Sequence, residues 1–534
     1  MARLLLGPIV RAAHRDRVTV WVETDEPCEV TVGPQTSRTV TLLGHHYAFV
    51  AVDGLGTATP YTVALDGEQV WPADGADFPP SVLRALPDDR LRLVFGSCRT
   101  ILPDENGDSD RIDALRECAL RCAGGDSEDL PDVLVLLGDQ VYADEGAPAT
   151  RRFVRRRRRT DGPVGAQTHT FAEFAALYRE AWSDPAVRWL LSTVPTLMIF
   201  DDHEIIDNWN TSEQWLAEHQ AQPWWRQRLT NGLAAYWIYQ HMGNLLPEER
   251  ETDAAFAALS GGDESVALDV FDTRATHGAL GTKGTRWSYV RALGPARLVM
   301  LDSRDGRVLA DGQRHMLDED GWELLEREVN AAEPYLLVGT SLPLLLPSGL
   351  FELERLVTAA CSGRWGRAGV RIGEEIRQAA QFTHWATFPG SFTRALQALR
   401  TAGDAGRKGV IVLSGDVHFS YDARVSSWAD GTTPRSPTHQ LVSSPLCHDL
   451  HGSIIGGVRA LVSRPGRFIG RLAARAAGRR RSALRWTIES GPWLHNVIST
   501  LDLGPDGASV RVECTRTGGR QGERLETVAE HLLT

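Results

Sequence analysis

Five apolar, strand-like runs constrain this chain most, because each leads directly into residues that can bind metal or move protons. Runs such as Val133–Leu137 and Val410–Leu413 are continuously apolar, which indicates strands buried on both faces of a sheet. Polar groups just beyond the C-terminal ends of such strands meet in one crevice. We therefore expect one site built from five strand ends. In chain order the motifs are Phe95-Gly96-Ser97-Cys98, Leu137-Gly138-Asp139-Gln140-Val141-Tyr142, Phe200-Asp201-Asp202-His203-Glu204, Leu301-Asp302-Ser303-Arg304 and Leu413-Ser414-Gly415-Asp416-Val417-His418.

The order of strand-like and helical segments predicts an α/β catalytic domain over residues 86–534. Residues 1–85 instead carry short strand patterns with regular turn signals, which predict a small N-terminal β-sandwich domain. A clustered aromatic stripe within 212–246 is typical of a core helix. The expected helical segments are 171–182, 212–246, 320–332 and 372–400.

The composition excludes some classes of function. The formal net charge of −12 argues against nucleic acid as the main partner. Seven irregularly spaced cysteines in a chain of 534 residues do not suggest a disulfide framework, so a reducing compartment is expected. We find no signal-peptide pattern and no uninterrupted apolar run of about 18 residues, and we therefore expect a cytoplasmic protein.

Four of the motif residues form a softer set of metal ligands. Asp139 follows Gly138, which allows the backbone to come close to an ion, and its carboxylate can bridge two cations. The Tyr142 phenolate is a hard anionic ligand that suits ferric iron. The Cys98 thiolate favours iron or zinc over magnesium, and His418 supplies an imidazole.

The remaining carboxylates form a harder set. Asp202 and Asp416, together with the shared Asp139, suit calcium, magnesium or manganese. Because Asp201 and Asp202 are adjacent, the sequence leaves open which of them coordinates a metal. A pair of unlike cations about 3.5–4 Å apart can clamp a phosphate and generate a metal-bound hydroxide that attacks phosphorus.

Three further residues are candidates for roles beside the metals. His203 is placed to protonate the leaving oxygen or to stabilise its developing charge. Arg304 could hold a phosphate oxygen bidentately, although an Asp–Arg pair at a strand end is often structural. Glu204 could either orient His203 or cap the next helix.

At this point the motif set resembles that of the alkaline phosphatase D type (PhoD-like) of the calcineurin-like metallophosphoesterase superfamily. The resemblance covers about residues 90–450. It implies a sandwich of two sheets flanked by helices, with the metals at the strand ends. The matching motifs are Ser97-Cys98, Gly138-Asp139-x-x-Tyr142, Asp201-Asp202-His203-Glu204, Leu301-Asp302-x-Arg304 and Gly415-Asp416-Val417-His418.

The resemblance also implies cofactors and an activity. It implies Fe³⁺ on the Cys98 and Tyr142 side and Ca²⁺ on the aspartate-rich side, with Mn²⁺, Mg²⁺ or Zn²⁺ as alternatives. The implied reaction is hydrolysis of small phosphomonoesters, and of diesters as an extension. Enzymes of this type are usually exported, whereas this sequence carries no export signal, so its substrate is expected to differ from theirs.

Two rival functions remain open. One is a phosphodiesterase or phospholipase D-like enzyme that acts on larger esters. The other is a catalytically idle protein that binds phosphate or lipid. The segment 452–488 carries nine arginines and no acidic residue. It could be a solvated surface, steer an anionic substrate, or make weak contact with an anionic membrane.

Overall fold

The computed structural model describes residues 1–534 except 57, 74, 76, 102–110, 126–129, 283–286, 449–455, 457–467, 469, 471, 473–483 and 519. The arginine-rich segment 452–488 therefore lies outside the described residues, apart from a few isolated positions and its last residues in a strand. Among the helices that are described, none is both long and apolar enough to cross a membrane.

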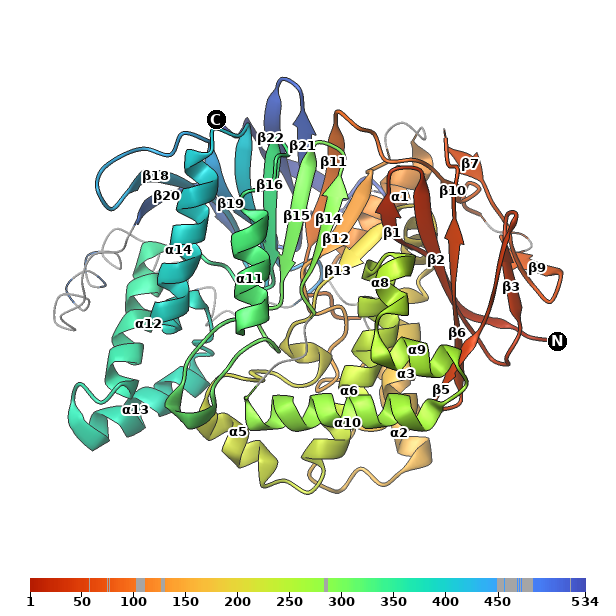
Figure 1. The fold of residues 1–534 in the computed structure, drawn as a ribbon, viewed down its shortest axis with the longest axis horizontal. Coiled ribbons are helices and arrows are strands. Elements are labelled where there is room, and N and C mark those ends of the chain that lie inside the picture. Colours follow the sequence, from red (N-terminus) through yellow and green to blue (C-terminus); the bar gives the residue numbers. More distant parts are fainter. Residues whose placement is uncertain are drawn as a thin grey trace.

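The N-terminal part is built from small antiparallel sheets, which lie at the right of Figure 1. Strand β2 (Arg17–Thr24), in the middle of one of these sheets, is buried on both faces. Val20 and Val22 point to one side, while Trp21 packs against Tyr239 of the helical region with 5.5 Å between ring centroids. The sheets are β1-β2-β6-β5 (Leu4–His14, Arg17–Thr24, His45–Val52, Val40–Leu42), β4-β3-β8-β9 (Gln35–Arg38, Glu29–Val32, Val63–Leu65, Glu68–Trp71) and β10-β7 (Val82–Leu83, Thr59–Pro60).

Two larger mixed sheets form the centre of the molecule (Figure 1). The predicted apolar runs occupy parallel strands in these sheets, and β12 and β17 are buried at every position, as continuous apolar runs require. The first sheet is β13-β12-β11-β21-β22-β23 (Thr196–Met198, Val133–Leu136, Leu91–Gly96, Val497–Gly504, Gly507–Thr515, Leu525–Leu532). The second is β14-β15-β16-β17-β19-β18-β20 (Tyr289–Leu293, Ala296–Leu301, Tyr335–Thr340, Gly409–Ser414, Thr438–Val442, Ser420–Trp428, Leu484–Trp493).

Helices flank both sheets. Helix α1 contacts β21 and β23 of the first sheet, while α11 and α14 cover β15 and β17 of the second. Figure 1 shows α5, α6 and α10 gathered below the sheets, and α12 with α13 at the lower left. The helices are α1 Ala114–Gly124, α2 Pro148–Arg157, α3 Phe171–Trp182, α4 Pro185–Leu191, α5 Glu213–Gln220, α6 Trp225–Tyr236, α7 Met242–Asn244, α8 Pro247–Glu251, α9 Ala254–Ser260, α10 Glu264–Leu280, α11 Glu319–Glu328, α12 Ser348–Cys361, α13 Gly366–Ala379 and α14 Pro389–Asp404.

The fold class predicted from the sequence is thus confirmed, with local differences. The aromatic stripe lies mainly in the core, since Trp225, Tyr236 and Trp237 are buried. The segment predicted as one helix over 372–400 is divided, because Pro389 starts a new helix and cannot continue the preceding one. Helix α12 was not among the predicted helices.

Candidate metal centre

The loops after β11, β12, β13, β15 and β17 meet at one edge of the two sheets, and backbone hydrogen bonds join them. Cys98 N donates to Gly138 O at 3.1 Å, and Gly415 N donates to Ser341 O at 2.9 Å. A bond between the sheets runs from Asp416 N to the Ser97 hydroxyl, at 3.2 Å. The predicted strand ends therefore converge.

Four of the six predicted ligands have left-handed backbone conformations. The φ angles are 57° at Cys98, 51° at Asp139, 64° at Asp416 and 56° at His418. Each such residue costs of order 1 kcal/mol or more and persists only where the surrounding structure demands it. Backbone strain is therefore found at residues whose side chains are predicted to bind the metals.

Two glycines allow the loops to approach each other. At Gly138, where φ is +104°, a Cβ atom would lie 2.7 Å from the Asp201 Cβ. At Gly415, a Cβ atom would lie 2.0 Å from the Ser97 hydroxyl oxygen. A side chain at Gly138 would push the Asp139 loop away from Asp201, and one at Gly415 would push the Asp416 loop away from Ser97.

Four buried or nearly buried carboxylates gather at the middle of the site. Asp139, Asp201, Asp202 and Asp416 each offer an oxygen within 4.8 Å of the others, and Asp139 and Asp202 form a second such group with His203. Burial and the neighbouring carboxylates raise the pKa of Asp139 well above its ordinary value. Without a cation, the Asp139 carboxyl therefore favours its protonated form.

Arg304 lies inside the acidic cluster, fully buried. Its Nε donates to Asp201 at 2.6 Å, and its Nη2 lies 3.1 Å from Asp416 and 3.3 Å from Asp202. Burial acts to raise the pKa of Asp416, but His384 and Arg304 hold it below its ordinary value. The guanidinium thus offsets part of the negative charge on this side of the centre.

The softer ligands lie on the opposite side of Asp139. The Cys98 thiol donates to Asp139 Oδ2 at 3.4 Å, and the Ser444 hydroxyl donates to Cys98 Sγ at 3.3 Å. Burial raises the pKa values of Cys98 and Tyr142 well above their ordinary values. Burial also lowers the pKa of His418 to about 3. All three groups are therefore neutral without a cation; a cation would displace the protons of Cys98 and Tyr142, whereas the neutral imidazole of His418 can bind one directly.

His203 is held at the rim of the site. Its Nδ1 lies 2.9 Å from Asp144 Oδ1, its Nε2 lies 3.7 Å from Asp207, and its ring centroid lies 4.3 Å from that of Tyr142, with the two rings tilted by 33°. Burial acts to lower the pKa of His203, but Asp144 outweighs it and raises the pKa well above its ordinary value. An imidazolium in a fixed orientation results.

Glu204 braces the loops and does not touch His203. Its carboxylate accepts hydrogen bonds from the backbone N–H groups of Asp139, Gln140 and Asp201, at 2.8–3.2 Å, and it completes a capping box with Asp201. Of the two alternatives left open by the sequence, the geometry therefore favours capping.

Several residues near the centre were missed by the sequence motifs. His384 Nε2 lies 3.5 Å from Asp416 Oδ2, and its Nδ1 is hydrogen-bonded to the buried Glu354 of α12. The His448 ring lies 4.1 Å from that of His418. Asp144, the partner of His203, is also new. None of these residues follows directly on an apolar run, so the pattern that identified the other residues carried no signal for them.

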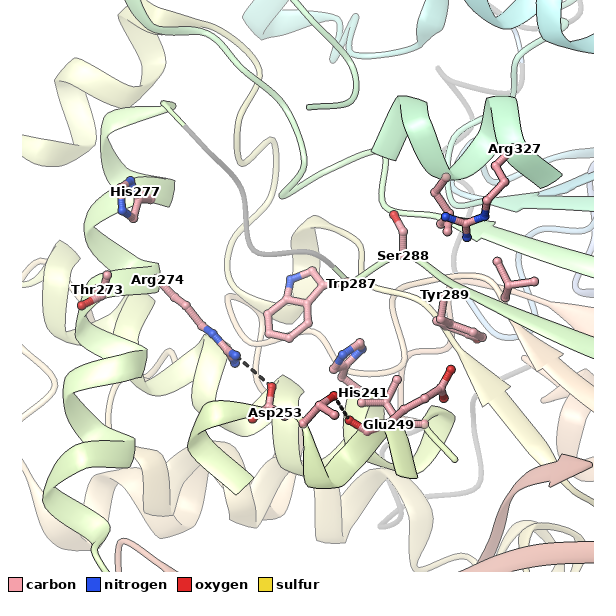
Figure 2. A pocket seen from close by; sticks show the side chains of 14 residues that line it. His241, Glu249, Asp253, Thr273, Arg274, His277, Trp287, Ser288, Tyr289 and Arg327 are labelled. Carbon is pink, nitrogen blue, oxygen red and sulfur yellow. Dashed lines mark hydrogen bonds and ion pairs between the residues drawn. The ribbon is translucent and has the colours of Figure 1, made fainter. Parts of the chain in front are cut away.

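A separate cavity of about 600 Å³ lies between α10 and β14 (Figure 2). Its lining includes His241, Trp287 and Arg274, the last paired with Asp253 at 2.9 Å. None of the eight predicted site residues lines it. The candidate centre is therefore defined by its converging side chains, and this cavity is not part of it.

Comparison with known proteins gives the family. A family model described as PhoD-like phosphatase matches residues 121–456, more than half of the chain. The chain belongs to this family. The match begins after Cys98 and includes the other predicted site residues. A second model, a domain of unknown function (DUF7800), matches residues 1–83. No curated protein matches the sequence significantly.

One solved structure supports the fold of this PhoD-like phosphatase. A structure of PhoD aligns over 98% of this chain and 92% of its own, with a TM-score of 0.59 and 13% identity. A purple acid phosphatase, PPD1 from yellow lupin (Lupinus luteus) seeds, aligns over 98% of this chain and 73% of its own, with a TM-score of 0.49 and 10% identity. At 13% identity, the likeness to PhoD shows the fold alone.

The residues of this PhoD-like phosphatase fit a pair of cations. Tyr142 Oη and Asp201 Oδ2 are buried and have no hydrogen-bond partner within the described part of the chain. Unpaired buried oxygens of this kind are costly, and cations would satisfy them. The thiol, phenol and imidazole on one side and the carboxylates on the other are suited to unlike cations.

Proposed function

We propose that this chain is a metal-dependent phosphoesterase that hydrolyses small phosphomonoesters at a two-cation centre. The observation that carries the proposal is the buried, crowded cluster of Asp139, Asp201, Asp202 and Asp416, beside neutral thiol and phenol groups. Membership of the PhoD-like phosphatase family supports the same class of reaction.

In this proposal the softer cation would be held by Cys98, Asp139, Tyr142 and His418, and ferric iron suits that set. Asp139, Asp202 and Asp416 would hold the harder one, for which calcium is proposed. When bound, such a pair of cations neutralises the charge of the phosphoryl group and lowers the pKa of water.

His203 would move the proton that the leaving group needs. Because Asp144 engages Nδ1, the proton available for transfer is the one on Nε2. The Tyr142 ring and Asp144 fix the plane and direction of the imidazolium. We infer that Nε2–H protonates the departing oxygen of the ester.

Arg304 would act mainly through the acidic cluster. Two of its nitrogens already face carboxylates, and only Nη1 lacks a hydrogen-bond partner among the described residues. We infer that Arg304 keeps Asp201 and Asp416 in place. A bidentate contact with phosphate stays a prediction, since it would require these ion pairs to rearrange.

The test combines elemental analysis of the purified full chain with turnover of p-nitrophenyl phosphate and bis-p-nitrophenyl phosphate, each with and without calcium. We expect two bound cations and faster turnover of the monoester. Faster diester turnover would favour the phosphodiesterase or phospholipase D-like alternative. A chain that binds phosphate, but neither holds metal nor turns over either compound after reconstitution, would favour the idle binding protein. The cytoplasmic location stays a prediction, which imaging of the tagged chain would test.

A further inference from the structure

Helix α13 presents an apolar stripe to solvent and a polar face to the protein. Ile372 is 55% exposed, Ile376 43% and Trp365, just before the helix, 47%. Their spacing of seven and four residues places them on one side of the helix. The opposite side carries Glu374 and Arg377, which are buried. This distribution is the reverse of that in an ordinary surface helix.

The buried polar face is firmly attached. Glu374 accepts a hydrogen bond from the Ser212 hydroxyl and pairs with Arg377 at 2.8 Å. Beyond the helix, Gln381 Nε2 donates to Asp207 at 2.9 Å. A rotation that buried the apolar stripe would break these contacts. The stripe is therefore a stable feature of this surface.

Exposed arginines accompany the stripe on and just before α13. Arg364, Arg367 and Arg371 are exposed, and the one exposed acid of α13, Glu375, pairs with Arg371 at 3.0 Å. This local excess of arginine is opposite in sign to the net charge of −12 of the whole chain. An apolar stripe with a tryptophan and flanking arginines is the pattern of a helix that lies in the headgroup region of an anionic membrane.

The shape of the region favours a lipid surface over a second copy of the chain. Helices α12 and α13 form a hairpin at one corner of the molecule (Figure 1). The three large apolar side chains of the stripe, each about half exposed, offer on the order of a few hundred Å². A stable dimer needs about 800 Å² from each partner. A narrow stripe on a corner can nevertheless insert into lipid.

We propose that α13 attaches this protein to anionic lipid surfaces, with Trp365, Ile372 and Ile376 inserted and the neighbouring arginines at the headgroups. This interaction goes beyond the proposed hydrolysis and does not depend on it. Long arginine side chains can remain in the headgroup layer while their stems contact the apolar boundary.

The test is co-sedimentation of the full chain with vesicles of phosphatidylcholine alone or mixed with phosphatidylglycerol. We expect binding to the mixed vesicles that weakens with salt. The double substitution Ile372→Asp/Ile376→Asp should lower the affinity at least about tenfold. A matched control, Val266→Asp/Val528→Asp, changes two equally exposed apolar residues elsewhere and should bind like the parent.

Turnover of p-nitrophenyl phosphate and circular dichroism report folding of each variant, and Trp365→Gln provides a milder change in the same stripe. Absence of binding to mixed vesicles would overturn the proposal. So would equal binding by the Ile372→Asp/Ile376→Asp variant, which would assign binding to another part of the chain, such as 449–483. A dimer in solution that this variant dissociates would identify a second copy as the occupant.

Discussion

The two halves of the candidate centre balance their charge differently. On one side, Cys98 and Tyr142 are neutral because burial and neighbouring acidic groups raise their pKa values. On the other, Arg304 already contacts three carboxylates, and His384 approaches Asp416 at 3.5 Å. The thiol and phenol of the first half ionise only when a metal binds. The carboxylates of the second half already have a positive counter-charge from the protein itself.

This difference teaches what each half requires of a cation. Binding on the softer side must displace protons from a thiol and a phenol, so it should depend on pH and hold a tightly bound ion. Binding on the acidic side must compete with a guanidinium, so the ion there should exchange more easily.

Removal of both metals should have the largest effect. We expect prolonged dialysis against a chelator to abolish turnover, because the proposed reaction depends on the cation pair. The acidic-side ion should leave first, since Arg304 remains to offset the carboxylates. Elemental analysis at intervals, alongside turnover, checks both points. Undiminished turnover by metal-free protein would contradict the two-cation proposal.

Single ligand changes should separate the two halves. Cys98→Ser should lose the softer cation and keep the harder one, while Asp202→Asn should do the reverse. Each should lower turnover by about 10²–10³-fold, the loss expected when a group that stabilises transition-state charge is removed. Metal content and kcat/KM are the measurements. Cys514→Ser, at a buried thiol in β22, is the matched control and should change neither.

Stability without metal should differ between the halves as well. Arg304→Gln leaves buried carboxylates without their counter-charge and should reduce the free energy of unfolding of metal-free protein by about 3–5 kcal/mol. Tyr142→Phe removes a buried hydroxyl that has no hydrogen-bond partner among the described residues, so it should be nearly neutral. Urea unfolding of the two metal-free variants makes the comparison. Equal losses would mean that the halves do not differ in this way.

The loss of turnover on breaking the Asp144–His203 pair should depend on the leaving group of the substrate. Asp144→Asn removes the carboxylate that orients and charges the imidazole. We expect turnover of an alkyl phosphate to fall by about 10²-fold, whereas p-nitrophenyl phosphate, which needs little protonation, should be affected much less. Equal losses for both substrates would assign His203 a role other than protonation of the leaving group.

His384 should have the smallest effect, confined to the acidic half. His384→Gln loses the imidazole that Glu354 directs towards Asp416. Affinity for the harder cation should fall by roughly 10–100-fold, as is usual for residues that orient a ligand. Calorimetric titration of calcium measures this effect. A simultaneous loss of the softer cation would show that His384 supports the whole centre.

Much of the centre could be predicted because its residues directly follow buried strands. Cys98, Asp139 and Asp416 were identified in this way, and the structure brings them together at one edge of the two sheets. Asp144, His384 and Glu354 could not be found so, because their contacts depend on loops and helices that carry no apolar strand pattern of their own. The choice between Asp201 and Asp202 remains open, since both belong to the same carboxylate cluster.

The sequence alone determined the fold class and the convergence of the strand-end motifs. Continuous apolar runs can only be satisfied by doubly covered strands, and the ends of parallel strands must share an edge. The tertiary structure decided the charge balance, which depends on distances between residues far apart in the chain, such as Arg304 and Asp201. It also decided the orientation of α13. An amphipathic pattern shows that a helix has two faces, but only packing determines which of them is turned to solvent.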